Sequence, residues 1–170
     1  MSQTGELTCA EFMTATHRLS GQISTGVKLL CDVLNDRSQS YLLVYNVYVS
    51  RLDDAGTIMT HAPAAYISKE NLTLVVCAGR EARSAERGRF SAHEYQALVT
   101  IDGFEVEGKF VGPHRLDLRA FSPANLDSFV VLTDAIARPM AIPDLSFAGE
   151  VILINRAHLE SLCLNEQGST

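Results

Sequence analysis

The sequence has 170 residues, of which 46% are hydrophobic and 20% are charged, and its formal net charge at pH 7 is −6. This balance is typical of a globular protein with a hydrophobic core, and it excludes both a disordered chain and a protein whose whole surface binds nucleic acid. No apolar run approaches the roughly 20 residues that a membrane span requires, and the first residues lack the basic start and apolar run of a secretory signal, so we expect a cytoplasmic protein without a membrane partner.

The N-terminal part of the chain, residues 7–78, has the pattern of a small β-domain. Alternating or continuous apolar residues predict five strands, over 9–18, 20–31, 40–50, 63–67 and 71–77. Asp53-Asp54-Ala55-Gly56 falls in the loop between the third and the fourth of these strands. Neighbouring carboxylates in such a loop point to different sides, so they do not predict a metal site.

Residues 79–92 are predicted to form a linker, and they are the only basic segment of the chain. The candidate phosphate contacts in this segment are Arg80, Arg83, Arg87 and Arg89. Such a cluster could contact a nucleic acid or a nucleotide. The alternative is a solvated connector in which Arg83 and Glu86 pair three residues apart. We favour the solvated connector, because most runs of charge are solvated surfaces.

Residues 93–165 are predicted to form a second small β-domain. Alternation over 95–101 predicts a strand, Asp102-Gly103 predicts a two-residue hairpin turn, and the chain returns over 104–111. Gly108 within the returning strand predicts a sharp bend or bulge. The remaining segments with strand patterns are 115–119, 128–137, 151–154 and 158–162.

The two β-domains align with each other when the chain is compared with itself. At an offset of 87, Ser20-Gly21 falls on Glu107-Gly108. At an offset of 88, residues 40–44 fall on 128–132, and after a variable loop the offset returns to 87. The shared apolar pattern, glycine position and loop positions predict a tandem duplication.

The second domain resembles an Sm-like barrel. Residues 99–111, which include Asp102-Gly103 and Gly108, look like the opening strands of that fold, residues 129–135 like its third strand, and residues 149–162 like its final pair of strands. The same order of elements is found in an uncharacterised group of bacterial domains. The resemblance implies an all-β protein with two tandem five-stranded, strongly bent Sm-like or SH3-like barrels and little helix.

RNA binding by Sm-like proteins commonly uses an Asp and an Asn after the second strand and an Arg-Gly pair in the last turn. Here the loop after the second strand is longer, and the last turn reads Asn155-Arg156-Ala157, with Ser68-Lys69-Glu70 at the equivalent place. The glycine is missing from both turns, so the resemblance does not carry RNA binding over. The candidate ligand or RNA contacts are Lys69, Arg115, Asp117, Asn125, Asn155 and Arg156.

The four cysteines, Cys9, Cys31, Cys77 and Cys163, lie in or beside apolar runs without CxxC spacing. We expect them to be reduced thiols that behave as small buried hydrophobic residues, with no metal or redox role. The sequence contains no GxSxG elbow, P-loop, GxGxxG or HExxH motif. It therefore predicts no catalytic residue, no cofactor and no metal site.

The most direct functional hypothesis is a non-enzymatic assembly or partner-binding protein. We expect a homo-oligomer formed through free edge strands, with the long strands at 40–50 and 128–138 as the candidate edges. By analogy with Sm-like rings, three chains would supply six barrels. The alternatives are an RNA-binding Sm-like protein, and a small-ligand-binding protein or enzyme with a pocket between the barrels around Arg115, Asp117 and Asn155.

Overall fold

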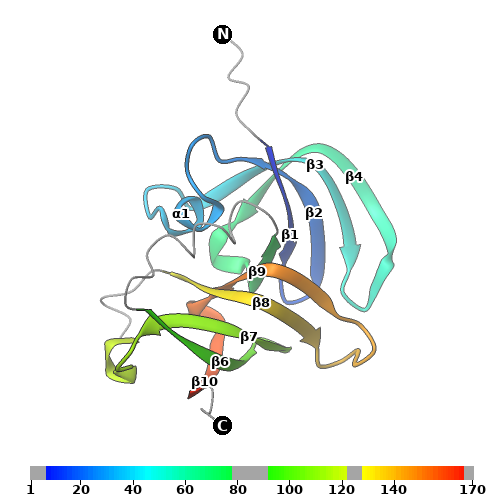
Figure 1. Cartoon of the computed structure of the whole chain (residues 1–170). Coiled ribbons are helices and arrows are strands. Elements are labelled where there is room, and N and C mark those ends of the chain that lie inside the picture. The colour runs from blue at the N-terminus through cyan, green and yellow to red at the C-terminus, as the bar shows by residue number, and fades with distance from the viewer. Residues whose placement is uncertain (1–6, 78–91, 122–127, 167–170) are drawn as a thin grey trace.

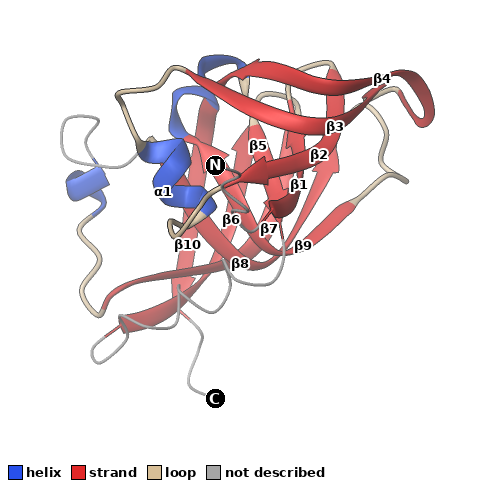
Figure 2. Cartoon of the chain, turned by 90° about the horizontal axis from the view of Figure 1, so that it is seen from above, coloured by secondary structure: helices blue, strands red, loops and turns tan. Residues whose placement is uncertain are grey.

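The structure, a computed structural model, describes residues 7–77, 92–121 and 128–166. The protein is all-β, and its helical elements are short (Figure 2). In residues 7–77 the elements are β1 (Leu7–Met13), β2 (His17–Ser24), α1 (Leu30–Asn35), β3 (Tyr41–Arg51), β4 (Asp54–Ser68), η1 (Lys69–Asn71) and β5 (Leu74–Cys77). In the rest of the described chain they are β6 (Ala92–Ile101), β7 (Phe104–Pro113), η2 (Leu118–Phe121), β8 (Phe129–Pro139), β9 (Phe147–Asn155), η3 (Arg156–His158) and β10 (Leu159–Glu166).

The ten strands form one antiparallel sheet in the order β10-β6-β7-β8-β9-β5-β1-β2-β3-β4. We call β1–β5 the first repeat and β6–β10 the second repeat. The two repeats lie one above the other in Figure 1 and are joined where β9 pairs with β5. The sheet is continuous and open, because β4 and β10 at its two ends are not paired with each other. The sequence predicts two barrels, and the strand pairing shows a single open sheet.

The two repeats share the same strand order, with the last strand beside the first and the other strands following in turn. Their pairing registers also correspond. In the first repeat Leu43 lies opposite Tyr66, and in the second Val131 lies opposite Leu153. These pairs are related by the offsets of 88 and 87 that the sequence comparison predicts.

A bulge interrupts the second strand of each repeat at the predicted glycine. The register shifts around Gly21 in the β2–β3 pair and around Gly108 in the β7–β8 pair. The partner strands carry Asn46 and Asp134 at positive φ angles of 50° and 48°. A Cβ on Gly108 would lie 2.7 Å from the Cβ of Ala135, so only glycine allows the two strands to approach this closely.

The predicted strands 9–18 and 20–31 are too long. A turn follows β1, in which the Thr14 hydroxyl accepts a hydrogen bond from the backbone N–H of His17 at 3.0 Å. After β2 the chain forms α1, because Leu30 and Leu34 are four residues apart and together bury one helical face. Asp32 accepts a hydrogen bond from the backbone N–H of Leu29 at the start of this helix.

Two other predicted elements differ from the structure. The alternating segment 115–119 is not a strand, and its end belongs to the 3₁₀ helix η2. The predicted loop at 53–56 lies largely within β4, which begins at Asp54 and continues to Ser68. The Asp102-Gly103 hairpin turn is confirmed, with both residues at positive φ.

The candidate edge strands were wrong. The segments 40–50 and 128–138 correspond to β3 and β8, and each is paired on both sides. An apolar run does not show whether a strand is interior, because β3 is exposed at most alternate positions whereas β8 is largely buried or half-buried, and both are paired on two sides. The edges of the sheet are β4 and β10.

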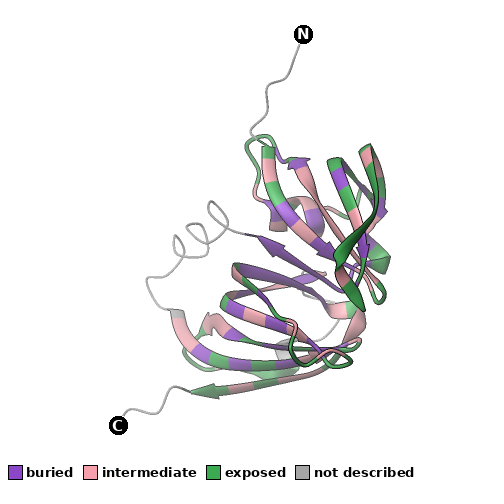
Figure 3. Ribbon diagram, turned by 90° about the vertical axis from the view of Figure 1, so that its right-hand side faces the viewer, coloured by how far each residue is buried: buried purple, intermediate pink, exposed green. Residues whose placement is uncertain are grey.

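Two hydrophobic clusters form the core, and each contains residues of both repeats. The first-repeat cluster includes Phe129 and Leu153 from the second repeat, and the second-repeat cluster includes Leu74 and Val76 from β5. All four residues of β5 are buried, and Figure 3 shows buried positions concentrated where the two halves meet. Within the described residues, no helix is long and apolar enough to cross a membrane.

Candidate functional site

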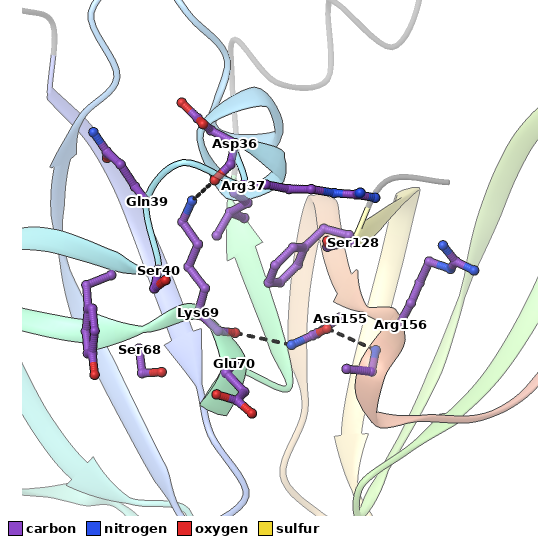
Figure 4. Close-up of a pocket in the computed structure, with 14 residues that line it drawn as sticks. Asp36, Arg37, Gln39, Ser40, Ser68, Lys69, Glu70, Ser128, Asn155 and Arg156 are labelled. Atoms are coloured by element: carbon purple, nitrogen blue, oxygen red, sulfur yellow. Dashed lines mark hydrogen bonds between the residues drawn. The ribbon is translucent and has the colours of Figure 1, made fainter. Parts of the chain in front are cut away.

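A cavity of about 750 Å³ lies at the junction of the two repeats (Figure 4). It is bounded by the segment that links α1 to β3, by the turn at η1, by the start of β8 and by the turn at η3. The turns at η1 and η3 occupy equivalent places in the two repeats. The cavity therefore lies where the corresponding corners of the two repeats face each other.

Lys69 in η1 is buried, with 7% of its surface exposed. Its ammonium group donates hydrogen bonds to the backbone carbonyls of Val33 at 2.6 Å and Asp36 at 2.9 Å. Burial lowers the pKa of Lys69, and the nearby Asp36 carboxylate partly offsets this effect. Through these two of its three donors, Lys69 holds the end of α1 against the β4–η1 corner.

Asn155 at the end of β9 is buried and connects the repeats. Its amide nitrogen donates to the carbonyls of Lys69 at 3.2 Å and Leu72 at 2.7 Å. Its amide oxygen accepts a hydrogen bond from the backbone N–H of Ala157 at 3.0 Å, which fixes the turn at η3. Asn155 therefore shapes one wall of the cavity and has little capacity left for a ligand.

Two arginines also line the cavity. Figure 4 shows the side chains of Arg37 and Arg156 on the side of the cavity where Ser128 lies. Guanidinium groups bind carboxylates and phosphates through pairs of parallel hydrogen bonds. An anionic group could be bound beside Arg37, Arg156 and the Ser128 hydroxyl, whereas the Asp36 and Glu70 carboxylates, which also line the cavity, would repel it.

The structure brings together three of the predicted contact residues, Lys69, Asn155 and Arg156. Of the residues expected around a pocket between the repeats, Asn155 lines this cavity and Arg115 and Asp117 do not. Both are exposed in the segment after β7, and the Asp117 carboxylate accepts a hydrogen bond from the backbone N–H of Arg119. Asn125, Arg80, Arg83, Arg87 and Arg89 lie outside the described residues.

The sequence analysis missed Arg37 and Ser128. Arg37 follows a helix that the apolar pattern does not predict, and the pattern around Ser128 predicts only the start of a strand. Leu30 and Leu34 are four residues apart, which is the spacing of one helical face. A helix predicted from this spacing would place residues 36–39, and with them Arg37, in the turn that follows it.

The cysteines differ from the expected buried state. All four are free thiols, but Cys9 and Cys163 are exposed and only Cys77 is buried. Cys9 and Cys163 lie on strands with one face toward solvent, so their apolar neighbours point to the opposite side. Among the described residues, no three His, Cys, Asp or Glu side chains are grouped closely enough to hold a metal ion.

Comparison of the chain with protein-family models, curated proteins and solved structures found no match.

Proposed function

We propose that this chain is a non-enzymatic assembly or partner-binding protein built from two Sm-like small barrels, and that it binds through its free strand edges. The observation that carries this proposal is the β5–β9 joint, in which one repeat binds the other by strand pairing. The same kind of edge remains available at both ends of the sheet, on β4 and β10. Free edges expose unpaired N–H and C=O groups that favour pairing with another strand.

The barrel part of the proposal is supported by the strand order within each repeat. The last strand lies beside the first, so the repeats read β5-β1-β2-β3-β4 and β10-β6-β7-β8-β9. Each repeat bends at a glycine bulge in its second strand. Such bends allow a short sheet to curl around its own core.

Size-exclusion chromatography with light scattering tests the proposal over a wide range of protein concentration. We expect a mass greater than that of one chain, 18.6 kDa, which increases with concentration until assembly is complete. A monomer at every concentration, together with no concentration-dependent gain in hydrogen-exchange protection at the outward-facing amides of β4 and β10, would contradict an assembly role.

The junction cavity supports a second candidate function, the binding of an anionic ligand such as an RNA phosphate. The supporting observation is that Arg37 and Arg156 line one cavity although 119 positions separate them in the chain. Filter binding of a single-stranded oligonucleotide over a salt series would test it. We expect Arg156→Ala to reduce affinity and to flatten the salt dependence by about one phosphate contact, whereas Arg115→Ala should leave both unchanged. No binding at low salt would remove this candidate.

A further inference from the structure

The two free edges of the sheet are the counterparts of the two strands that join inside the molecule. At the internal joint, β9 lies antiparallel to β5, with Ile154 opposite Leu74 and Val151 opposite Cys77. The repeat offset of 87 relates β9 to β4 and β5 to β10. The two ends of the sheet, β4 and β10, therefore correspond to the two strands, β9 and β5, that already pair inside the molecule.

The face beside β4 is apolar and exposed. Tyr41 and Tyr66 are 58% and 76% exposed, and Leu43 between them is also exposed. In the sheet, Tyr66 lies directly opposite Leu43. These three residues, Tyr41, Leu43 and Tyr66, form what we call the tyrosine face.

Two of the three residues equivalent to the tyrosine face are buried in the second repeat, and the third, Val131, is partly buried against the same cluster. Phe129 and Leu153, the counterparts of Tyr41 and Tyr66, are 3% and 0% exposed. They pack in one cluster with Val75 of β5 and with the leucines of α1. The tyrosine face thus corresponds to a surface that β5 and α1 cover in the second repeat. Among the described residues, no strand or helix covers the tyrosine face in the same way.

The strand segments that would meet across such a joint carry no protective charge. Residues 64–67 of β4 are Ala-Ala-Tyr-Ile, and residues 161–164 of β10 are Ser-Leu-Cys-Leu. Edge strands that avoid association usually carry charged residues, proline or bulges. Such features flank these segments, at Pro63 in β4 and at Glu160 and the bulge between Leu159 and Ser161 in β10, but the segments themselves contain no charge and no proline. Cys163 is exposed, whereas its counterpart at the internal joint, Val76, is buried.

We propose that a second copy of this chain covers the tyrosine face, with β10 of one copy pairing antiparallel to β4 of the next. The inference rests on the proposed assembly function and names its partner. Transferring the internal register gives four opposite pairs between copies: Ile67 with Ser161, Tyr66 with Leu162, Ala65 with Cys163, and Ala64 with Leu164. The exposed Leu118 of η2, at the place equivalent to α1, would cover Tyr41 and Leu43 as α1 covers Phe129.

This joint is heterologous, because two different strands meet in it. Repetition of such a contact closes into a ring or continues as a filament. It differs from a symmetric dimer, in which β4 would pair with β4 or β10 with β10. Cysteine cross-linking can distinguish these arrangements, because the native Cys163 lies in one of the pairing segments.

The experiment uses the full chain with Cys9 and Cys31 replaced by serine and the buried Cys77 replaced by alanine. Residues directly opposite in antiparallel strands have Cα atoms about 4.5–5.5 Å apart, which suits a disulfide. With Ala65→Cys added, mild oxidation should give a ladder of covalently linked chains. Ala62→Cys should give none, because three residues along a strand displace the thiol by about 10 Å.

Two single-thiol chains decide the direction of the joint. One carries Ala65→Cys with Cys163→Ser, and the other keeps Cys163 alone. Each should remain uncross-linked when oxidised by itself, and an equal mixture should give covalent dimers only. Cross-linking of either chain with itself would overturn the head-to-tail joint.

A charge in the tyrosine face supplies an independent readout. Tyr66→Lys should weaken self-association at least about tenfold, because the ammonium group would lie opposite Leu162 in an apolar contact. Val27→Lys, at a position 90% exposed outside the proposed joint, should leave association unchanged. An oligomer that forms without the 65–163 cross-link and tolerates Tyr66→Lys would overturn this inference while leaving the assembly function standing, and a strict monomer would refute both.

Discussion

Asn155 links the two repeats through the hydrogen bonds of a single buried amide. Two of its bonds reach carbonyls in the first repeat, at Lys69 and Leu72, and the third holds its own turn at Ala157. The internal counterpart of Asn155 is Ser68, which is only partly buried. Both residues line the junction cavity, but the hydrogen bonds across the junction come from Asn155.

We expect Asn155→Ala to lower the free energy of unfolding by about 2–3 kcal/mol, because it leaves two buried carbonyls and one N–H without this partner. Ser68→Ala is the matched control at the equivalent position and should change stability by less than about 0.5 kcal/mol. Chemical denaturation of the two variants measures the difference. Equal effects would mean that the amide does not hold the joint.

The site residues differ in how far the sequence could identify them. Lys69 and Arg156 stood out because a basic residue occurs at equivalent turns of both repeats. Arg37 cannot be found in this way, since it follows α1, whose short apolar segment fits the end of a strand as well as a helix. A short apolar run fits a strand or a helix equally well, and only its tertiary packing decides between them.

At the scale of the strands, the glycine bulges determine how sharply each repeat bends. Gly21 and Gly108 lie in the second strand of each repeat, close to the third strand. A Cβ at Gly108 would lie 3.1 Å from the Cα of Ala135 and 3.2 Å from the carbonyl oxygen of Thr133. Because backbone atoms block the space, the strands would have to separate to accept a side chain.

We expect Gly108→Ala to destabilise the protein by about 1–3 kcal/mol through this overpacking. Gly56→Ala is the control, because no atom lies within 4 Å of a Cβ at that position in β4. It should change stability by no more than about 0.5 kcal/mol. Urea denaturation compares the two, and a Gly108→Ala protein as stable as the control would show that the bend does not depend on glycine.

At the scale of the whole molecule, the two repeats depend on each other. Each hydrophobic cluster takes side chains from both, and the β5–β9 pairing makes their sheets continuous. Leu153 of β9 is fully buried in the cluster of the first repeat, although it belongs to the second. Removing it therefore affects both repeats.

We expect the chain to unfold in a single cooperative transition, since neither core is complete without the other repeat. Leu153→Ala should lower the stability by about 2–5 kcal/mol, with hydrogen exchange accelerating in strands of both repeats. Ala148→Gly, on the exposed start of β9, is a control that should lower the stability much less than Leu153→Ala, because it removes no buried side chain. Two separate transitions, or faster exchange confined to the second repeat, would contradict this dependence.

The sequence by itself determined the all-β character, most strand positions, the Asp102-Gly103 turn and the correspondence between the repeats. These features follow from the alternation of side chains along a strand and from the special conformations of glycine, which are local properties. Only the tertiary structure decided that β3 and β8 are interior, that β4 and β10 are the edges, and that Lys69 and Asn155 meet across the junction. The physical reason is that an apolar pattern shows which side of a strand is buried but not which distant strand completes its hydrogen bonds, so the joint between the repeats appears only once the chain is folded.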